Sequence, residues 1–379
     1  MANTITNVIP SLMARGVLAA RQNAILTRII NRDYQSAAAQ QGNVVNVPIS
    51  SAIATRAVTP SVTMNSNVDV SPTKVSVTLD LWYESPFQVS DSDDLSVIDS
   101  FNDMNASEAV KSLINQVESD ILSKHVGIYG LAGTAGTTPF NASLNAAAKA
   151  DRILNSQLCP VDQRRAVIDP FARELLILNT QVLQADQRGD TEGIVRGTIG
   201  TKLGFDWYMD QNITTFTPGT GWVTGWSLST VSGTAGNTTL NILNATATGT
   251  IKQGDIFTVS GSTQQYVVTA LNSAAATTAV IITFKPALAT TVATGAAITV
   301  IATAYTVNLA FHREAFIFAS RPLGRVGAVS NIFQAPTDPV SGLAMRLELS
   351  RQYKQDTFSF DLLYGTGLVR DIYACKIAG

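Results

Sequence analysis

The sequence predicts an α+β fold that carries a separate all-β unit, a small barrel or sandwich. Residues 213–304 contain 23 threonines but only three charged side chains, and short β-branched runs recur there between Gly, Asn and Ser. Apolar and polar residues alternate along residues 74–81, as in a strand with one wet face. Residues 107–124 instead place apolar side chains at i, i+3 and i+4, which is typical of a long amphipathic helix.

Composition argues against most enzyme classes. The chain has 379 residues, a formal net charge of -2 and two histidines, His125 and His312. Cys159 and Cys375 lie far apart without a CxxC pair, so neither a disulfide framework nor a zinc site is indicated. The phosphate-loop, nucleophile-elbow and zincin motifs are missing as well. We therefore expect a protein that is not an enzyme and needs no cofactor or metal.

The first 42 residues are expected to form an N-terminal arm with a helix over 11–32, capped by Ser11. The stretch has neither the charge pattern nor the apolar run of a secretory signal, and no segment of the chain is apolar enough to span a membrane. Four arginines against Asp33 give the first 40 residues a net charge of +3, and they are a possible inward contact with nucleic acid or scaffold: Arg15, Arg21, Arg28 and Arg32. A solvated helix face is the simpler interpretation.

Residues 43–90 are expected to form a long, exposed β-hairpin. The strand that continues from residue 74 would pair with residues 44–49, and the stretch between them is rich in Ser, Thr and Asn. Asp91, Asp93, Asp94, Asp99 and Asp103 follow as a dense acidic cluster. Metal binding at Asp91, Asp93 and Asp94 stays open, although acidic residues before a helix also favour its positive end.

The rest of the chain alternates helices and strands around the threonine-rich segment. Helices are expected over 143–157 and 170–184, with a buried strand at 166–169 between them. His125 is expected to cap the preceding helix as a partly charged imidazole. After residue 304, strands are expected at 306–319, 346–353 and 357–363, followed by a turn at Gly365–Gly367 and a last strand over 368–377. The segments before 213 and after 304 would form one discontinuous domain.

Several short motifs, in this order, resemble the major capsid (coat) proteins of tailed bacteriophages with the Hong Kong 97-type fold. The resemblance is greatest to short-tailed phage coat proteins with a β insertion domain. The similar stretches are GNVVNVP at 42–48, the helix at 105–124, AVIDP at 166–170, GTIG at 197–200 with GFDWYM at 204–209, IKQGDIF at 251–257, AFHREAF at 310–316, RPL at 321–323, FDLLYG at 360–365 and LVR at 368–370.

The resemblance implies a domain layout. It comprises an N-terminal arm (1–42), an extended β-hairpin loop (43–90), a spine helix with peripheral domain (91–140), the first part of an axial domain (141–212), a β insertion domain (213–304) and a return of axial and peripheral domains (305–379). Neither a maturation cleavage site nor a crosslinking pattern is visible.

The function implied is a structural one. Such a protein self-assembles as hexamers and pentamers into an icosahedral shell around double-stranded DNA, which it contacts non-specifically. Scaffolding and portal proteins would be further partners, the location would be the virion capsid, and assembly would take place in the host cytoplasm without a membrane. The alternatives are a nanocompartment shell of the same fold around a cargo protein and a surface adhesin with an Ig-like module.

Overall fold

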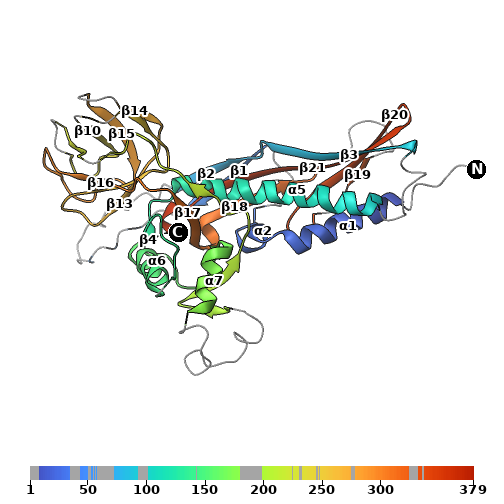
Figure 1. The fold of residues 1–379 in the computed structure, drawn as a ribbon, viewed down its shortest axis with the longest axis horizontal. Helices are drawn as coiled ribbons and strands as arrows, with labels where there is room; N and C mark the ends of the chain where they lie inside the picture. Colours follow the sequence, from blue (N-terminus) through green and yellow to red (C-terminus); the bar gives the residue numbers. More distant parts are fainter. Residues whose placement is uncertain are drawn as a thin grey trace, which may run out of the picture. The chain divides into compact units, whose positions relative to one another are not determined.

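The protein has an α+β fold, as the sequence predicted, and the chain divides into two compact units. Unit 1 comprises residues 1–23, 32–113 and 317–369, and unit 2 comprises residues 24–31, 114–316 and 370–379. The structure is a computed structural model (Figure 1) that describes residues 8–34, 43–49, 53, 55, 57, 72–92, 101–141, 143–179, 199–223, 225–229, 233–244, 246, 248–274, 278–323, 332–334 and 337–379. None of the helices in these ranges is long and apolar enough to cross a membrane.

Unit 1 is built on a five-stranded sheet around β21 (Gln355–Leu368), which runs antiparallel to two of its neighbours. Its strand order is β18 (Phe316–Arg321), β21, β20 (Met345–Gln352) and β19 (Ile332–Gln334), and β3 (Leu81–Ser90) also pairs with β21. β3, β20 and β21 are the long strands of this sheet (Figure 1). Helix α1 (Val8–Asn23) packs closely on it, since a Cβ at Gly16 would lie 3.1 Å from the Phe360 ring.

The hairpin is shorter than the sequence predicted. β1 (Val44–Ile49) pairs antiparallel with β2 (Thr73–Thr78), but the chain leaves this pairing at Leu79. Leu79 is buried in the same apolar cluster as Val45, Val47 and Val77, so the alternating pattern runs past the end of the paired strand. The second half of the expected hairpin, β3, belongs to the other sheet because its partner is the distant strand β21.

The expected turn at Gly365–Gly367 is wrong, because β21 runs straight through these residues to Leu368. Gly365 has a different role. A Cβ there would lie 2.2 Å from the backbone oxygen of Thr78, a distance that no side chain can occupy. The glycine therefore permits the close passage of another backbone, and the last strand, β22 (Ala374–Ala378), begins later than predicted, after a short 3-10 turn at Asp371–Tyr373.

The expected single helix over 11–32 is interrupted. α1 begins at Val8, so Ser11 lies inside it, and α2 (Leu26–Ile29) is a separate turn in unit 2. The break has a clear cause, because the Glu118 carboxylate accepts hydrogen bonds from the backbone amides of Ile25 and Leu26.

The long helix expected at 107–124 is confirmed as α5 (Phe101–Ser123), with Val110, Val117 and Ile121 buried.

Unit 2 contains a mixed sheet. Its strand order is β4 (Leu131–Gly133), β22, β17 (Tyr305–His312), β5 (Arg164–Ile168), β7 (Phe205–Met209) and β6 (Thr201–Lys202), and β8 (Thr215–Phe216) pairs with β17. The pairs β4–β22 and β5–β7 are parallel, and β17 runs antiparallel to both of its neighbours.

Two helices pack on this sheet of unit 2. α6 (Asn145–Ser156) buries Ala147, Ala150 and Leu154, and α7 (Pro170–Leu178) buries Ala172 and Leu176, all in one apolar cluster with β5 and β22. Asp169 caps α7 by accepting a hydrogen bond from the Phe171 amide, next to a proline at the first helical position. Residues 180–184 of the expected third helix lie outside the described residues.

The threonine-rich segment forms its own antiparallel sheet, as its β-branched runs predicted. The strand order is β16 (Ile298–Val300), β12 (Ile256–Val259), β13 (Gln265–Val268), β15 (Val280–Lys285), β10 (Thr239–Leu243) and β9 (Ser227–Leu228), beside the pair β11 (Gly249–Ile251) and β14 (Asn272–Ala274). An aromatic cluster fills its interior, and it contains Trp222, Trp226, Phe257, Tyr266 and Phe284.

One of the three charges in this segment is internal. Asp255 is fully buried and accepts hydrogen bonds from the Trp222 indole (2.6 Å) and from the amides of Gly219 and Lys252. Burial raises the pKa of Asp255, although these hydrogen bonds act in the opposite direction. The carboxylate ties two turns to the aromatic cluster, which explains a charge in an otherwise neutral segment.

Candidate assembly surfaces

The β1–β2 hairpin has one buried and one wet face. Val45, Val47 and Val77 pack against β18, whereas Asn46 and Ser76 face solvent and share a hydrogen bond of 2.7 Å. Among the described residues, neither strand pairs with a third strand. Unpaired strand edges are available for pairing with another chain, so this hairpin is a candidate contact surface.

Two of the four N-terminal arginines are engaged within unit 1. Arg21 donates to the Asp338 carboxylate at 2.6 Å, and Arg32 donates to the backbone oxygen of Val340. Burial would raise the pKa of Asp338, but hydrogen bonds from Arg21 and Ser341 outweigh it and lower the pKa to about 2. The structure thus assigns local partners to Arg21 and Arg32, and their contact with nucleic acid or scaffold stays a prediction.

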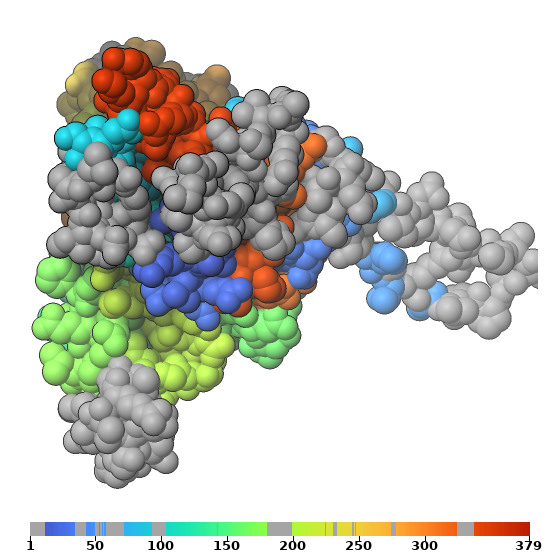
Figure 2. Space-filling model, turned by 90° about the vertical axis from the view of Figure 1, so that its right-hand side faces the viewer, coloured from blue at the N-terminus to red at the C-terminus, as the bar shows by residue number. Residues whose placement is uncertain are grey.

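The other two arginines do not share these partners. Arg15 is exposed on α1, part of whose surface is open to solvent in Figure 2, and Arg28 is exposed on α2 in unit 2.

Asp91, the first residue of the acidic cluster, is bound by an arginine. Arg351 donates two hydrogen bonds to Asp91, at 2.8 and 2.9 Å, and binds Asp356 as well. Asp93 and Asp94 lie outside the described residues. Within the part of the chain that is described, no three His, Cys, Asp or Glu side chains gather in a way that could hold a metal ion.

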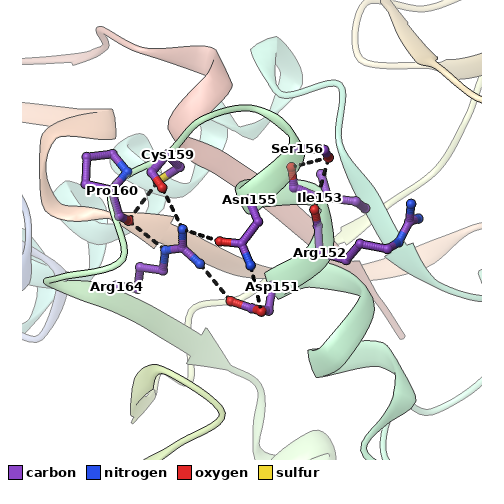
Figure 3. A network of polar contacts seen from close by, with 8 residues as sticks. All are labelled: Asp151, Arg152, Ile153, Asn155, Ser156, Cys159, Pro160 and Arg164. Carbon is purple, nitrogen blue, oxygen red and sulfur yellow. Dashed lines mark hydrogen bonds and ion pairs between the residues drawn. The ribbon is translucent and has the colours of Figure 1, made fainter.

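A loop at residues 157–163 in unit 2, hydrogen-bonded to a buried arginine, is a functional candidate that the sequence did not reveal (Figure 3). Arg164, 3% exposed, donates to the carboxylate of Asp151 (2.7 Å), to the Asn155 side chain (2.8 Å) and to the backbone oxygens of Cys159 and Pro160. One guanidinium therefore ties the end of α6, the loop and the start of β5 together. Five fixed donors make arginine well suited to this.

This loop and the following helix present apolar side chains to solvent. Leu158 is 87% exposed, in a left-handed conformation with φ 58°, and Val161 is 75% exposed. Phe171 (71%) and Leu178 (60%) on α7 are exposed as well. Large apolar side chains that stay in water over a short stretch are typical of protein interaction surfaces. Two apolar residues flanking Cys159-Pro160, between a helix and a buried strand, are the sequence signal that could have indicated this loop.

We expect Arg164→Met to lower the free energy of unfolding by about 2–4 kcal/mol, because it leaves buried carbonyl oxygens without donors. Denaturant titration of both proteins would measure the loss. Arg152→Met is the matched control, since Arg152 lies on α6 beside Asp151 but is exposed. Equal stability of the two variants would contradict the role assigned to Arg164.

A fully buried lysine lies between the threonine-rich sheet and the rest of unit 2. The Lys376 amine donates to the backbone oxygen of Gly254 at 3.3 Å and lies 5.6 Å from the centre of the Phe216 ring. Burial lowers the pKa of Lys376 to about 7, although the negative charge of Asp255 acts in the opposite direction.

Both cysteines are buried and unpaired.

His125 caps its helix as expected, but its burial disfavours the charged imidazole. Its Nδ1 lies 2.9 Å from the Leu122 backbone oxygen, and its ring packs edge-on against Phe216. Burial, helped by the charge of Lys376, lowers the pKa of His125 to about 4. The expectation of a partly charged imidazole overlooked this burial, because a helix end in the sequence does not reveal what covers it.

Comparison with known proteins identifies the fold. No protein-family model and no curated protein matches the sequence. Among solved structures, a chain from Mycobacterium phage Che8 aligns over 94% of this chain and 91% of its own length, with 15% identity and a TM-score of 0.53. The capsid structure of the cyanophage P-SCSP1u aligns over 94% and 88%, with 12% identity and a TM-score of 0.51.

The chain has the fold of phage major capsid proteins. At these identities the likeness concerns the fold, and it extends over nearly the whole length of the chain. The resemblance that short motifs indicated is thus confirmed at the level of the capsid-type fold.

Proposed function

We propose that this chain is the major capsid protein of a tailed bacteriophage and self-assembles into an icosahedral shell around double-stranded DNA. The observation that carries the proposal is the alignment with a cyanophage capsid over 94% of the chain. Two features support it, because shell subunits need surfaces that bind copies of themselves: the β1–β2 hairpin, which pairs with no third strand in the described part of the chain, and the exposed apolar side chains near residues 158–178.

We further propose the Hong Kong 97-type domain layout. Residues 1–42 would be the arm, 43–90 the extended loop, 91–140 the spine helix and peripheral domain, 141–212 with 305–379 the axial domain and its return, and 213–304 the insertion domain. The separate sheet and aromatic cluster of residues 213–304 support the last of these. The role of this sheet as an autonomous domain stays a prediction.

The proposed partners follow from a shell. Copies of the chain would form hexamers and pentamers, scaffolding and portal proteins would direct assembly in the host cytoplasm, and the packaged DNA would be contacted non-specifically. A low net charge of -2 supports close packing of many copies, because it limits their mutual repulsion. The role is structural, with no catalytic step.

Electron microscopy of the expressed full chain tests this function. We expect closed particles, or curved sheets at high protein concentration, by negative stain and by sedimentation. Particles produced in phage-infected cells should contain nuclease-protected DNA. A monomer at every concentration, with or without a co-expressed scaffolding protein, would contradict the proposal, and particles that enclose a protein cargo without DNA would indicate a nanocompartment.

A further inference from the structure

A polar cavity lies in unit 2 between the threonine-rich segment and helix α6. Its volume is about 470 Å³. One wall comes from the residues that lead into β4 and from the last turn of α6, and the other comes from residues 261–265 and 289–290. Small-molecule sites in proteins have volumes of roughly 300–1,000 Å³. The cavity is therefore large enough for one small ligand.

Direct contacts hold the two walls together. The Leu131 amide donates to the Gln265 side-chain oxygen at 2.7 Å, and the Gln265 side-chain amide donates to the Leu131 backbone oxygen at 3.0 Å. Gly130 lies beside this pair, and a Cβ there would lie only 2.9 Å from the Ile153 side chain. The close approach of β4 and α6, together with the two hydrogen bonds of Gln265, defines the shape of the cavity.

Arg152 is the only charged side chain among the described residues that line the cavity. It is exposed and extends away from the polar network of Arg164 (Figure 3), and its guanidinium forms no hydrogen bond or ion pair with the described residues. The neighbouring carboxylates are engaged elsewhere, since Asp151 binds Arg164 at 2.7 Å and Asp371 pairs with Lys285 at 3.8 Å. A guanidinium without a carboxylate partner favours an anionic ligand.

The other polar groups of the cavity are uncharged and open to a ligand. The Gln157 side-chain amide forms no hydrogen bond with the described residues, and its oxygen is buried. A buried oxygen without a donor is costly, and the terminal torsion of glutamine is soft enough to turn it toward a donor. Thr263 and Thr290 add exposed hydroxyl groups that are likewise unpaired in the described part of the chain. These groups match a ligand that carries hydroxyls.

We propose that this cavity binds a sugar that carries a carboxylate or a phosphate. Arg152 holds the anionic group, to which a guanidinium can donate two parallel hydrogen bonds, and Gln157, Thr263 and Thr290 pair with the sugar hydroxyls. A peptide fits less well, because extended peptides bind to unpaired backbone groups, whereas Gln265 already occupies both backbone groups of Leu131. The site lies within one chain, so it does not depend on the proposed shell function.

Calorimetric titration of the full chain with glucuronate and with glucose 6-phosphate tests the site. Glucose, which is neutral, and glutarate, which has carboxylates but no hydroxyls, are the matched ligands. We expect at least one acidic sugar to bind on the order of tenfold more tightly than either of them, because both the charge and the hydroxyls contribute. The proposal is overturned if neither acidic sugar binds at roughly 10 mM. Glutarate that binds as tightly as the acidic sugars would also overturn it, because the cavity would then hold any anion.

Substitution of Arg152 locates the binding. Arg152→Gln should weaken binding of the acidic sugar on the order of tenfold and remove its advantage over glucose, and the exposed position should leave the fold intact. Lys149→Gln is the matched control, since it removes the same charge one turn away on α6, outside this cavity. It should bind like the wild type. Gln157→Leu should weaken the acidic sugar and glucose alike, because the lost contact is with a hydroxyl. Wild-type affinity of Arg152→Gln for the acidic sugar would overturn the proposal.

Discussion

Deletion of residues 52–70 should abolish shell formation and leave the chain folded. In the hairpin, Ile49 is paired with Thr73, so the deletion leaves four residues (50, 51, 71 and 72) to connect the two strands. A loop of this length can close an antiparallel hairpin. The buried face of the hairpin stays in place through Val45, Val47 and Val77, and only the long polar connection is lost.

Sedimentation and negative-stain microscopy would show the loss, and circular dichroism would confirm the fold. A chain in which residues 52–70 are scrambled, with length and composition kept, is the control. If scrambling also prevents assembly, specific contacts of this stretch are required; if the scrambled chain assembles, its length suffices. Normal shells from the deletion would show that residues 52–70 have no part in assembly.

Replacement of Lys376 by methionine should stabilise the protein at neutral pH and have less effect at alkaline pH. The folded chain holds the amine with a pKa of about 7, below the ordinary value of 10.5, so between these values it binds fewer protons than the unfolded chain. Wild-type stability should therefore rise with pH across this window, by at most about 5 kcal/mol. Methionine fills the same space without the desolvation cost of the amine.

Denaturant titrations at pH 7 and pH 10 would measure this difference. Lys285→Met is the control, since the Lys285 side chain is 60% exposed and its ion pair with Asp371 is long, at 3.8 Å. The difference in stability between Lys285→Met and the wild type should be about the same at pH 7 and at pH 10. A Lys376→Met protein that is less stable than wild type at both pH values would show that the bond to Gly254 outweighs the cost of burial.

Much of the local structure could be predicted from the sequence. Periodic apolar side chains located α5, and β-branched runs located β12, β13 and β15, because both patterns arise from residues that are close along the chain. The capsid-type fold was also accessible, since short motifs in a shared order indicated it. The exposed apolar side chains of the 157–163 loop could not be predicted from the sequence. Their exposure depends on a guanidinium from the following strand.

The errors share a physical cause. A period of two along residues 74–90 indicates strands, but it carries no information on which strand is the partner, and β3 pairs with residues about 270 positions away. Gly365 suggested a turn, because the sequence does not show that the backbone of Thr78 passes beside it. The helix over 11–32 is divided by Glu118, more than 90 residues further along.

By itself, the sequence determined the local elements, the neutral β-rich segment and the class of fold. Tertiary structure decided the chemistry of the buried polar groups. Glu118 is an ordinary glutamate on a polar position of a helix until Asp210 and the Ile25 amide lie beside it, and Lys376 is an ordinary strand lysine until Gly254 and Phe216 cover it. Desolvation and neighbouring charge set their protonation, and both depend on residues that only folding brings together.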